Sequence, residues 1–376
     1  MTKILIPIET ASGERRVSAT PAAVKKLKGL GCEVFVESSA GELSGFNDTL
    51  YKESGGEIVS KSIINIWENA DVIFCVQIPS ESNLGKLKKG AILLGLLNPY
   101  ANKKLQNIII SKKISALSME LLPRISRAQS SDVLSSQANI AGYKAVLLAA
   151  SELDRYFPML MTAAGTVQPA KVVVLGGGVA GLQAVATAKR LGAIVFVSDI
   201  RPAVKEQVES LGARFIELPE IDEKPGESGG YAKAVTPEFL SKQKATLTKY
   251  LSEADVAVCT AQVLGKKAPV LIDSHMIEKM RSGAVVIDLA VSQGGNCEGT
   301  KSNETIISNG VKLIGAGELP SSVPYDASTL YAKNLTSLIT PFIKDGVINL
   351  DIEDELISGC LLSDEGVILQ NKVFEK

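Results

Sequence analysis

The residues with the clearest chemical role form a glycine-rich turn made of Gly176, Gly177, Gly178, Val179, Ala180 and Gly181. Its first, third and sixth residues fit G-x-G-x-x-G, and the turn follows an apolar run and opens a small-residue helix. Gly176 permits the tight turn, Gly178 lets the backbone approach a pyrophosphate, and Gly181 lets helix and strand pack closely. Free N–H groups at the positive end of a helix dipole bind phosphates, so the turn predicts a dinucleotide site.

An acidic residue, Asp199, ends the next apolar run at the distance where dinucleotide-binding proteins carry a ribose-binding carboxylate. A 2′-phosphate beside it would cost about 1–4 kcal/mol per charge pair at surface-like dielectric. That cost outweighs the attraction of one flexible arginine, Arg201. The sequence therefore predicts NAD(H) rather than NADP(H), with Asp199, Ile200 and Arg201 in the nucleotide site.

The chain supplies a scaffold of alternating strands and helices for these residues. Apolar runs at 3–8, 33–37, 70–76, 91–96 and 114–117 form one series, and runs at 171–175, 193–198, 255–260, 284–288 and 311–314 form a second. Such alternation is typical of parallel sheets with helices on both faces. We predict an α/β fold with two doubly wound Rossmann-like domains and parallel sheets, joined by long helices around a cleft.

Two helices are expected to connect these domains. Apolar residues at helical spacing predict one helix over 139–157 and a second over 328–339 that returns the chain to the first domain. The first domain is then discontinuous, residues 1–138 plus 325–376. Residues 139–324 form the NAD(H)-binding Rossmann domain together with the connecting helix. A chain of 376 residues suits two cores.

Composition excludes several other classes of function. A net charge of −1 offers no basic surface for nucleic acid. The five cysteines form no CxxC pair and no Cys/His cluster, which indicates reduced thiols in a cytosol-like compartment and no metal site. The single histidine, His275, is expected on an exposed helix. No apolar stretch reaches the roughly 18 residues of a membrane span, so we expect no span in this chain.

A segment over 220–233 breaks the alternation, because it is acidic, contains Pro225 and three glycines, and has little to bury. Long loops of this kind in compact domains are usually functional lids or solvated insertions, and composition leaves both interpretations open. Helix formation is expected to resume at Thr236 and Pro237.

Several longer motifs resemble those of the soluble NAD(H)-binding domain I of proton-translocating NAD(P) transhydrogenases and, more distantly, alanine dehydrogenase. The resemblance runs along essentially the whole chain. Its most specific pieces are PRISRAQS at 123–130, LSSQANIAGY at 134–143, GVAGL at 178–182, GGYAK at 229–233, IDLA at 287–290 and GGNC at 294–297.

The resemblance implies further site residues. It places Arg124, Gln129 and Asp132 in a loop at the nicotinamide, and it implies a mobile lid that carries Gly230 and Tyr231. An arginine and a glutamine can hydrogen-bond a carboxamide and orient the ring, and the aspartate can hold the arginine. Gln262 stands near the adenine or lid contact, where the family has an apolar residue. The nucleotide site predicted on these grounds includes Gly230 and Gln262.

The sequence departs from alanine dehydrogenase at the residues that move protons. The family's catalytic lysine, in a V-K-x-P stretch, is replaced by Gln77, and its catalytic histidine falls near Asn98. Arg16 resembles the carboxylate-binding arginine of that family, and we interpret it as a structural remnant. Without lysine and histidine, proton transfer to a keto acid has no obvious agent.

These observations favour an enzyme component of the transhydrogenase type, Si-specific/Re-specific and proton-translocating. The resemblance implies a cytoplasmic homodimer, peripherally attached to the membrane through a membrane subunit, that passes hydride between NAD(H) held here and NADP(H) on a beta subunit. Direct transfer between nicotinamides needs orientation and exclusion of water, but no acid or base. An alanine dehydrogenase-type amino-acid dehydrogenase and a non-catalytic NAD(H) sensor remain as alternatives.

Overall fold

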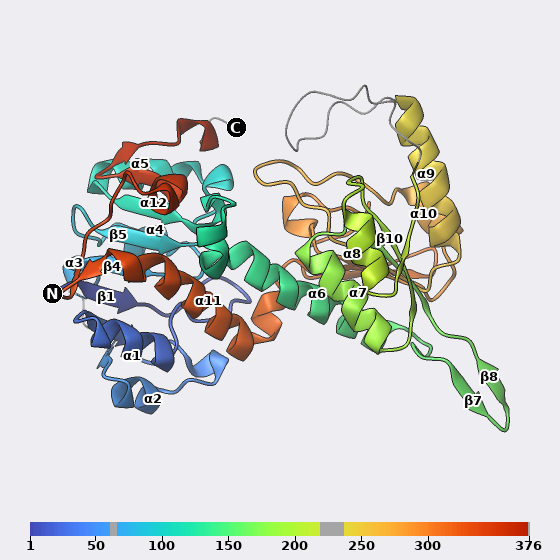
Figure 1. The fold of residues 1–376 in the computed structure, drawn as a ribbon, viewed down its shortest axis with the longest axis horizontal. Helices are drawn as coiled ribbons and strands as arrows, with labels where there is room; N and C mark the ends of the chain where they lie inside the picture. Colours follow the sequence, from blue (N-terminus) through green and yellow to red (C-terminus); the bar gives the residue numbers. More distant parts are fainter. Residues whose placement is uncertain (61–65, 219–236, 375–376) are drawn as a thin grey trace. The chain divides into compact units, whose positions relative to one another are not determined.

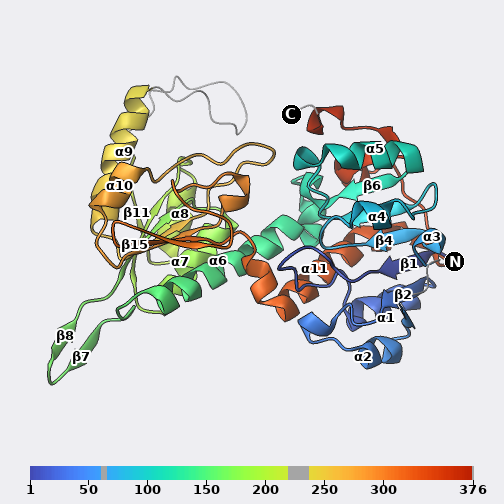
Figure 2. The ribbon, with the colours of Figure 1, turned by 180° about the vertical axis from the view of Figure 1, so that it is seen from behind.

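The computed structural model describes residues 1–60, 66–218 and 237–374, and the chain divides into two compact units. Unit 1 comprises Met1–Gln137 and Pro320–Lys376, and unit 2 comprises Ala138–Leu319. Figures 1 and 2 show a central sheet with flanking helices in each unit. Both units are Rossmann-like, as the alternation of strands and helices predicted.

The sheet of unit 1 has the strand order β19-β18-β6-β5-β4-β1-β2-β3. Its parallel strands are β1 (Lys3–Ile6), β2 (Glu33–Glu37), β3 (Glu57–Val59), β4 (Val72–Phe74), β5 (Ile92–Gly95) and β6 (Ser115–Ser118). The C-terminal strands β18 (Leu361–Asp364) and β19 (Val367–Ile368) extend the sheet in antiparallel fashion. The sheet therefore departs from the expected parallel arrangement only at this edge, because a short hairpin after α12 (Glu355–Cys360) returns the chain along β6.

The helices of unit 1 cover both faces of this sheet. They are α1 (Pro21–Gly29), α2 (Asp48–Glu53), α3 (Ile66–Asn69), α4 (Glu81–Leu84), α5 (Lys103–Lys112), α11 (Pro324–Ile339) and α12 (Glu355–Cys360). A small hairpin of β16 (Ile343–Lys344) and β17 (Val347–Ile348) follows α11. Successive side chains of β1 point to opposite faces of the sheet, with Ile4 and Ile6 in one apolar cluster and Leu5 in another. Both faces of the sheet are therefore buried under helices.

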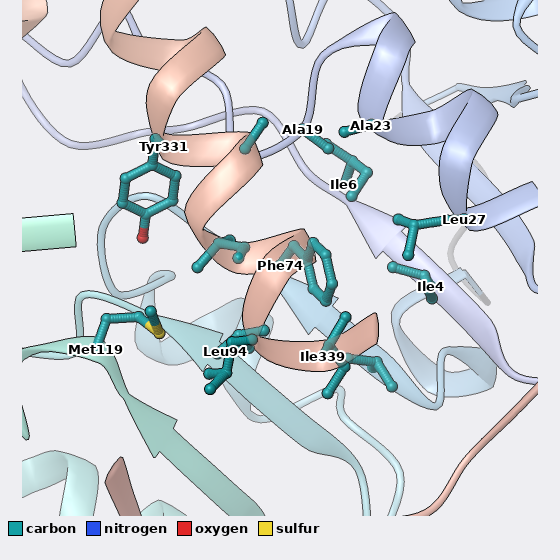
Figure 3. Close-up of a cluster of buried hydrophobic side chains, with 14 of the residues drawn as sticks. Ile4, Ile6, Ala19, Ala23, Leu27, Phe74, Leu94, Met119, Tyr331 and Ile339 are labelled. Atoms are coloured by element: carbon teal, nitrogen blue, oxygen red, sulfur yellow. The ribbon is translucent and has the colours of Figure 1, made fainter. Parts of the chain in front are cut away.

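Helix α11 lies over the sheet of unit 1 and closes the first of these clusters. Figure 3 shows Tyr331 and Ile339 of α11 on the same side of the strands as Ile4, Phe74 and Leu94. The Tyr331 hydroxyl donates a 2.7 Å hydrogen bond to the backbone oxygen of Cys75, so its one polar atom is satisfied inside the core. A distant part of the sequence therefore completes this core.

The sheet of unit 2 has the order β11-β10-β9-β12-β13-β15-β14, parallel except for β14. Its strands are β9 (Lys171–Leu175), β10 (Ile194–Ser198), β11 (Arg214–Phe215), β12 (Val256–Cys259), β13 (Val285–Asp288), β14 (Thr305–Ser308) and β15 (Val311–Gly315). Its helices are α7 (Val179–Arg190), α8 (Val204–Ser210), α9 (Pro237–Ser252) and α10 (Ser274–Lys279). Residues Val172 and Val174 of β9 enter one core and Val173 and Leu175 the other, so this sheet is also covered on both faces.

The connecting helix α6 spans Val133–Glu152, whereas the sequence predicted 139–157. It begins early because the Asp132 carboxylate accepts hydrogen bonds from the backbone N–H of Ser135 at 2.9 Å and from its hydroxyl at 2.6 Å, which caps the first turn. It ends early because Arg155 binds Asp255 at 2.7 Å and the Gln168 backbone oxygen at 3.0 Å. Helix α11 likewise starts four residues before the prediction, with Pro324 in its first turn.

Sequence reasoning missed the hairpin of β7 (Leu160–Thr162) and β8 (Gly165–Val167), which extends from the sheet of unit 2 in Figures 1 and 2. Met161, in β7 of this hairpin, is 77% exposed. All five cysteines are free, as predicted, and all are buried. Across the part of the chain that the structure describes, no helix is long and apolar enough to cross a membrane.

Candidate nucleotide-binding site

The predicted dinucleotide residues of unit 2 follow neighbouring parallel strands. Strand β9 pairs in parallel with β10 on one side and β12 on the other, and β12 pairs with β13. Gly176 follows β9, Asp199 follows β10 and Thr260 follows β12 closely, so these residues share the carboxyl edge of the sheet. Ligands of open α/β sheets bind at this edge, where the order of strands reverses.

Two glycines of the turn are required by close packing. Gly176 has φ +105°, and a Cβ there would lie 2.6 Å from the Thr260 hydroxyl. A Cβ at Gly181 would lie 1.9 Å from the backbone oxygen of Gly176. No side chain fits at either position, so the strand, the turn and α7 approach one another as the sequence motif requires.

The turn is open at Gly178, whereas a Cβ on the neighbouring Gly177 would lie 2.3 Å from Cγ1 of Val204. Gly178 is the N-cap residue of α7, no side chain caps the helix, and a Cβ on Gly178 would meet no atom within 4 Å. The positive end of this 12-residue helix therefore has no side-chain cap and leaves open space at Gly178. This arrangement fits a pyrophosphate, which needs close backbone approach and several N–H donors. Val179 is 42% exposed beside it.

Asp199 is held firmly at the end of β10. Its carboxylate accepts hydrogen bonds from the backbone N–H of Gly177 at 2.7 Å and of Arg201 at 2.8 Å. The Arg201 side chain donates two more, from Nε and Nη2, each at 2.9 Å. Burial acts to raise the pKa of Asp199, but the hydrogen bonds from Arg201 and Gly177 outweigh it and lower the pKa below its usual value. Ile200, next in the chain, is 54% exposed.

A buried network supports the turn from the neighbouring strands. The Thr260 hydroxyl donates to the backbone oxygen of Gly176 at 2.9 Å, and Ala261 N–H donates to the Asn296 side chain at 3.0 Å. Asn296 in turn is tied to Asp288, whose Oδ2 accepts its backbone N–H at 2.9 Å. Thr260, Asn296 and Asp288 were not among the predicted site residues. The position of Asp288 at the end of an apolar run, like that of Asp199, was the signal for it.

Gln262 lies on the loop after β12. Its side-chain amide donates to the backbone oxygen of Leu289 at 2.7 Å, so it ties this loop to the one after β13. Two other predicted site residues, Gly230 and Tyr231, lie outside the described residues, as does the whole predicted lid over 220–233.

The predicted nicotinamide residues belong to unit 1: Arg124 precedes the short helix η4 (Ser126–Ser131), Gln129 lies within it, and Asp132 follows it. Arg124 and Gln129 are exposed. Both oxygens of Asp132 bind Ser135, and within the described ranges Asp132 forms no ion pair with Arg124. The aspartate therefore fixes the start of α6, and with it the end of the loop that carries the other two side chains.

Arg16 lies in a buried polar network of unit 1. Its Nε and Nη2 donate to the two oxygens of Glu14 at 2.7 and 2.6 Å, and its Nη1 donates to the Gln137 side chain at 2.9 Å. Gln77 and Ser321 also donate to Glu14, at 3.2 and 2.7 Å. Burial acts to raise the pKa of Glu14, but the hydrogen bonds and charge of Arg16 outweigh it and lower the pKa to about 2. The guanidinium is thus neutralised inside the chain.

The two positions compared with the acid and base of alanine dehydrogenase hold no titratable side chain. Gln77 donates to Glu14, and Asn98 is exposed with φ +44°. Nearby, burial raises the pKa of Glu9 to about 8, while its carboxyl accepts hydrogen bonds from Val76 and Gln77 backbone N–H groups. In the described part of the chain, no three His, Cys, Asp or Glu side chains form a metal-binding group.

Comparison with known proteins identifies relatives along nearly the whole chain. Residues 5–141 match the N-terminal domain, and residues 145–371 the C-terminal domain, of the family described as alanine dehydrogenase/PNT. An NAD(P) transhydrogenase alpha-subunit chain of Rhodospirillum rubrum is 47% identical over 375 residues, covering 98% of this chain and 97% of that protein.

Alanine dehydrogenase 2 of Staphylococcus aureus is a more distant relative, 31% identical over 342 residues, with 89% of this chain and 85% of that protein covered. Among solved structures, the transhydrogenase from Sinorhizobium meliloti matches with a TM-score of 0.88 at 40% identity, covering 98% of this chain and 100% of that one. The higher identities belong to the transhydrogenases.

Proposed function

The chain belongs to the alanine dehydrogenase/PNT family, among homologues of the transhydrogenase alpha subunit, and we propose that it is the NAD(H)-binding component of a proton-translocating NAD(P) transhydrogenase. In this role it exchanges hydride between NAD(H) held here and NADP(H) held on a partner subunit. When bound, NAD(H) supplies or accepts the hydride. The chain itself binds, orients and shields the nucleotide.

The main support for the proposal is the polar network in unit 1, in which Arg16 is already paired with Glu14 of the same chain. An amino-acid dehydrogenase must bind a carboxylate substrate and move protons on its carbon and nitrogen. Here the Arg16 guanidinium is bound by Glu14 with both residues buried, and Gln77 donates to that same Glu14. Hydride exchange between two nicotinamide rings needs neither an acid nor a base, so this arrangement suits transhydrogenation.

The nucleotide would be held mainly by unit 2. The first-turn N–H groups of α7, beside the open position at Gly178, suit the pyrophosphate, and Asp199 suits the adenosine ribose. Exposed Ile200 offers an apolar surface to the adenine. Arg124 and Gln129 would orient the carboxamide of the nicotinamide ring, since both are exposed on one short loop and carry hydrogen-bond donors.

The partners follow from the same role. We propose a membrane subunit that carries the proton pathway and a beta subunit that holds NADP(H), so that this chain attaches to the membrane only through them. We further propose a homodimer. Exposed Met159 and Met161, 56% and 77% accessible on or beside the β7–β8 hairpin, form an apolar surface suited to a second copy.

Mixing this chain with an NADP(H)-binding transhydrogenase domain tests the proposal. NADH and thio-NADP⁺ should give thio-NADPH only when both proteins are present, whereas pyruvate, ammonia and NADH should give no alanine with this chain. Turnover of pyruvate at ordinary enzyme rates would favour an alanine dehydrogenase. NADH binding without either activity would favour a non-catalytic sensor.

A further inference from the structure

The hydrogen bonds of Asp199 leave no room for a ribose as they stand. An ionised carboxylate offers about four acceptor positions. Oδ1 accepts from the backbone N–H and Nε of Arg201, and Oδ2 accepts from the Gly177 N–H and Arg201 Nη2, at 2.7 to 2.9 Å. All four positions are therefore taken within the chain. A ribose that binds Asp199 must replace at least one of these donors.

The four donors differ in how easily they can leave. The N–H groups of Gly177 and Arg201 belong to the backbone of the turn and the strand end, where any movement would disturb the fold. The Arg201 guanidinium ends a flexible side chain that is 57% exposed, whereas the Asp199 side chain is 6% exposed. Its two bonds are worth little, because an exposed arginine regains water when it leaves. The guanidinium is the group that can be displaced.

We propose that Arg201 is a displaceable counter-ion that sets nucleotide selectivity: the ribose diol of NAD(H) displaces its side chain from Asp199. This inference rests on the proposed nucleotide-binding function. Asp199 alone would favour NADH over NADPH, and Arg201 acts against that preference. In the free protein the ion pair cancels the charge that would repel a 2′-phosphate, and a released guanidinium beside the ribose can pair with that phosphate. Arg201 therefore narrows the preference for NADH over NADPH.

Two nucleotides of equal charge can separate the displacement of Arg201 by the ribose from the attraction of Arg201 for the phosphate. AMP and 2′-deoxy-AMP differ in one ribose hydroxyl, so the long-range attraction of Arg201 for the phosphate acts equally on both. We would measure their dissociation constants, by displacement of NADH fluorescence, for the wild-type chain and for Arg201→Met, which keeps the stem and removes the donors. The preference for AMP over 2′-deoxy-AMP should grow about two- to fivefold in Arg201→Met, the range expected for losing an exposed ion pair.

Two further variants serve as matched controls. Lys205→Met removes a cation that pairs with Glu217 rather than Asp199, and it should leave the AMP preference unchanged. Arg201→Lys keeps the charge but loses the planar fork, and it should fall between wild type and Arg201→Met. The ratio of NADPH to NADH dissociation constants should rise at least fivefold in Arg201→Met.

The possible results distinguish failure of the Arg201 displacement from failure of the proposed nucleotide-binding function. An unchanged AMP preference in Arg201→Met, with NADH still bound, overturns the displacement and leaves the nucleotide site in place. An equal loss of affinity for AMP and 2′-deoxy-AMP assigns Arg201 to phosphate attraction alone and also overturns it. If neither wild type nor Lys205→Met binds NADH, the proposed function fails and the inference fails with it.

Discussion

Each unit contains an arginine paired with a carboxylate two residues before it in the sequence, Glu14–Arg16 in unit 1 and Asp199–Arg201 in unit 2. The pairs have the same bonding, because Nε and Nη2 of each arginine donate to the two oxygens of its partner. They differ in burial. Arg16 is 4% exposed and Arg201 57%. The burial of the arginine, rather than the geometry of the pair, therefore determines how easily the guanidinium can leave its carboxylate.

The physical basis of the difference is solvation. A guanidinium that leaves its partner inside a core loses its counter-charge and gains no water, whereas an exposed one is resolvated at once. Gln77, Gln137 and Ser321 add further hydrogen bonds around the buried pair, and they come from separate parts of unit 1. The unit 1 pair therefore belongs to the fold, whereas the exposed unit 2 pair is the one that we propose a nucleotide opens.

The largest effect is expected from removing one partner of the buried pair. Glu14→Ala leaves the Arg16 guanidinium buried without a counter-charge and should lower the free energy of unfolding by about 3–5 kcal/mol. Urea unfolding of the full chain measures it. Asp199→Ala removes the equivalent partner of an exposed arginine and serves as the comparison. Similar losses from both variants would show that burial does not distinguish the pairs.

The pH dependence of stability should single out Glu14. Its folded pKa of about 2 lies below its unfolded value near 4.5, so its contribution is complete above pH 5 and is lost as pH falls toward 2. The loss amounts to ~3 kcal/mol. The measurement is the difference in unfolding free energy between wild type and Glu14→Gln at several pH values. A difference that stays constant between pH 5 and 2.5 contradicts the assignment.

Glu9 gives the opposite sign within the same unit. Burial raises its folded pKa to about 8, so its contribution is complete below pH 4.5 and is lost as pH rises through 8. Wild type should therefore lose stability relative to Glu9→Gln between pH 5 and 8. Glu14→Gln and Glu9→Gln should therefore change the pH dependence of the unfolding free energy in opposite directions.

A smaller effect separates binding from folding in unit 2. Gly178→Ala adds a methyl group where no atom lies within 4 Å, so the chain should fold normally while a pyrophosphate loses its close backbone approach. We expect NADH affinity to fall at least tenfold, about 1.4 kcal/mol. Gly29→Ala, in the equally open end of α1, is the matched control and should leave NADH affinity unchanged. Unaltered binding by Gly178→Ala would place the phosphates elsewhere.

The smallest effect concerns the support beneath the turn. Thr260→Val keeps the shape but removes the hydroxyl that bonds Gly176, so NADH should bind about two- to fivefold more weakly. Thr260→Ser restores the hydroxyl and should recover most of the affinity. If serine fails to rescue it, the methyl group rather than the hydrogen bond supports the turn.

Strands and turns that are determined by residues close together in the sequence could be predicted from it. Most strands were correct, because apolar runs determine them locally, and the spacing of the glycine turn and Asp199 placed both at the ends of neighbouring strands, while their roles toward a nucleotide stay predictions. Helix α6 was placed too late, although Asp132 and Ser135 stand at capping distance in the sequence. The network around Glu14 joins residues more than 300 positions apart, and no local pattern encodes it. The pairing of Arg201 with Asp199 was also beyond the sequence, since the same arginine could equally have faced a ligand.

The stereochemistry of hydride transfer shows whether hydride passes directly between two nicotinamide rings. NADH carrying deuterium on one or the other face of C4 would be mixed with this chain, an NADP(H)-binding transhydrogenase domain and NADP⁺ in ordinary water. If the chain only orients two rings for direct exchange, deuterium should reach NADPH from one NADH epimer alone, without dilution by solvent, and should stand on the opposite face of the product. Solvent hydrogen at C4 of NADPH, or deuterium transferred from both epimers, would contradict direct exchange between two oriented rings.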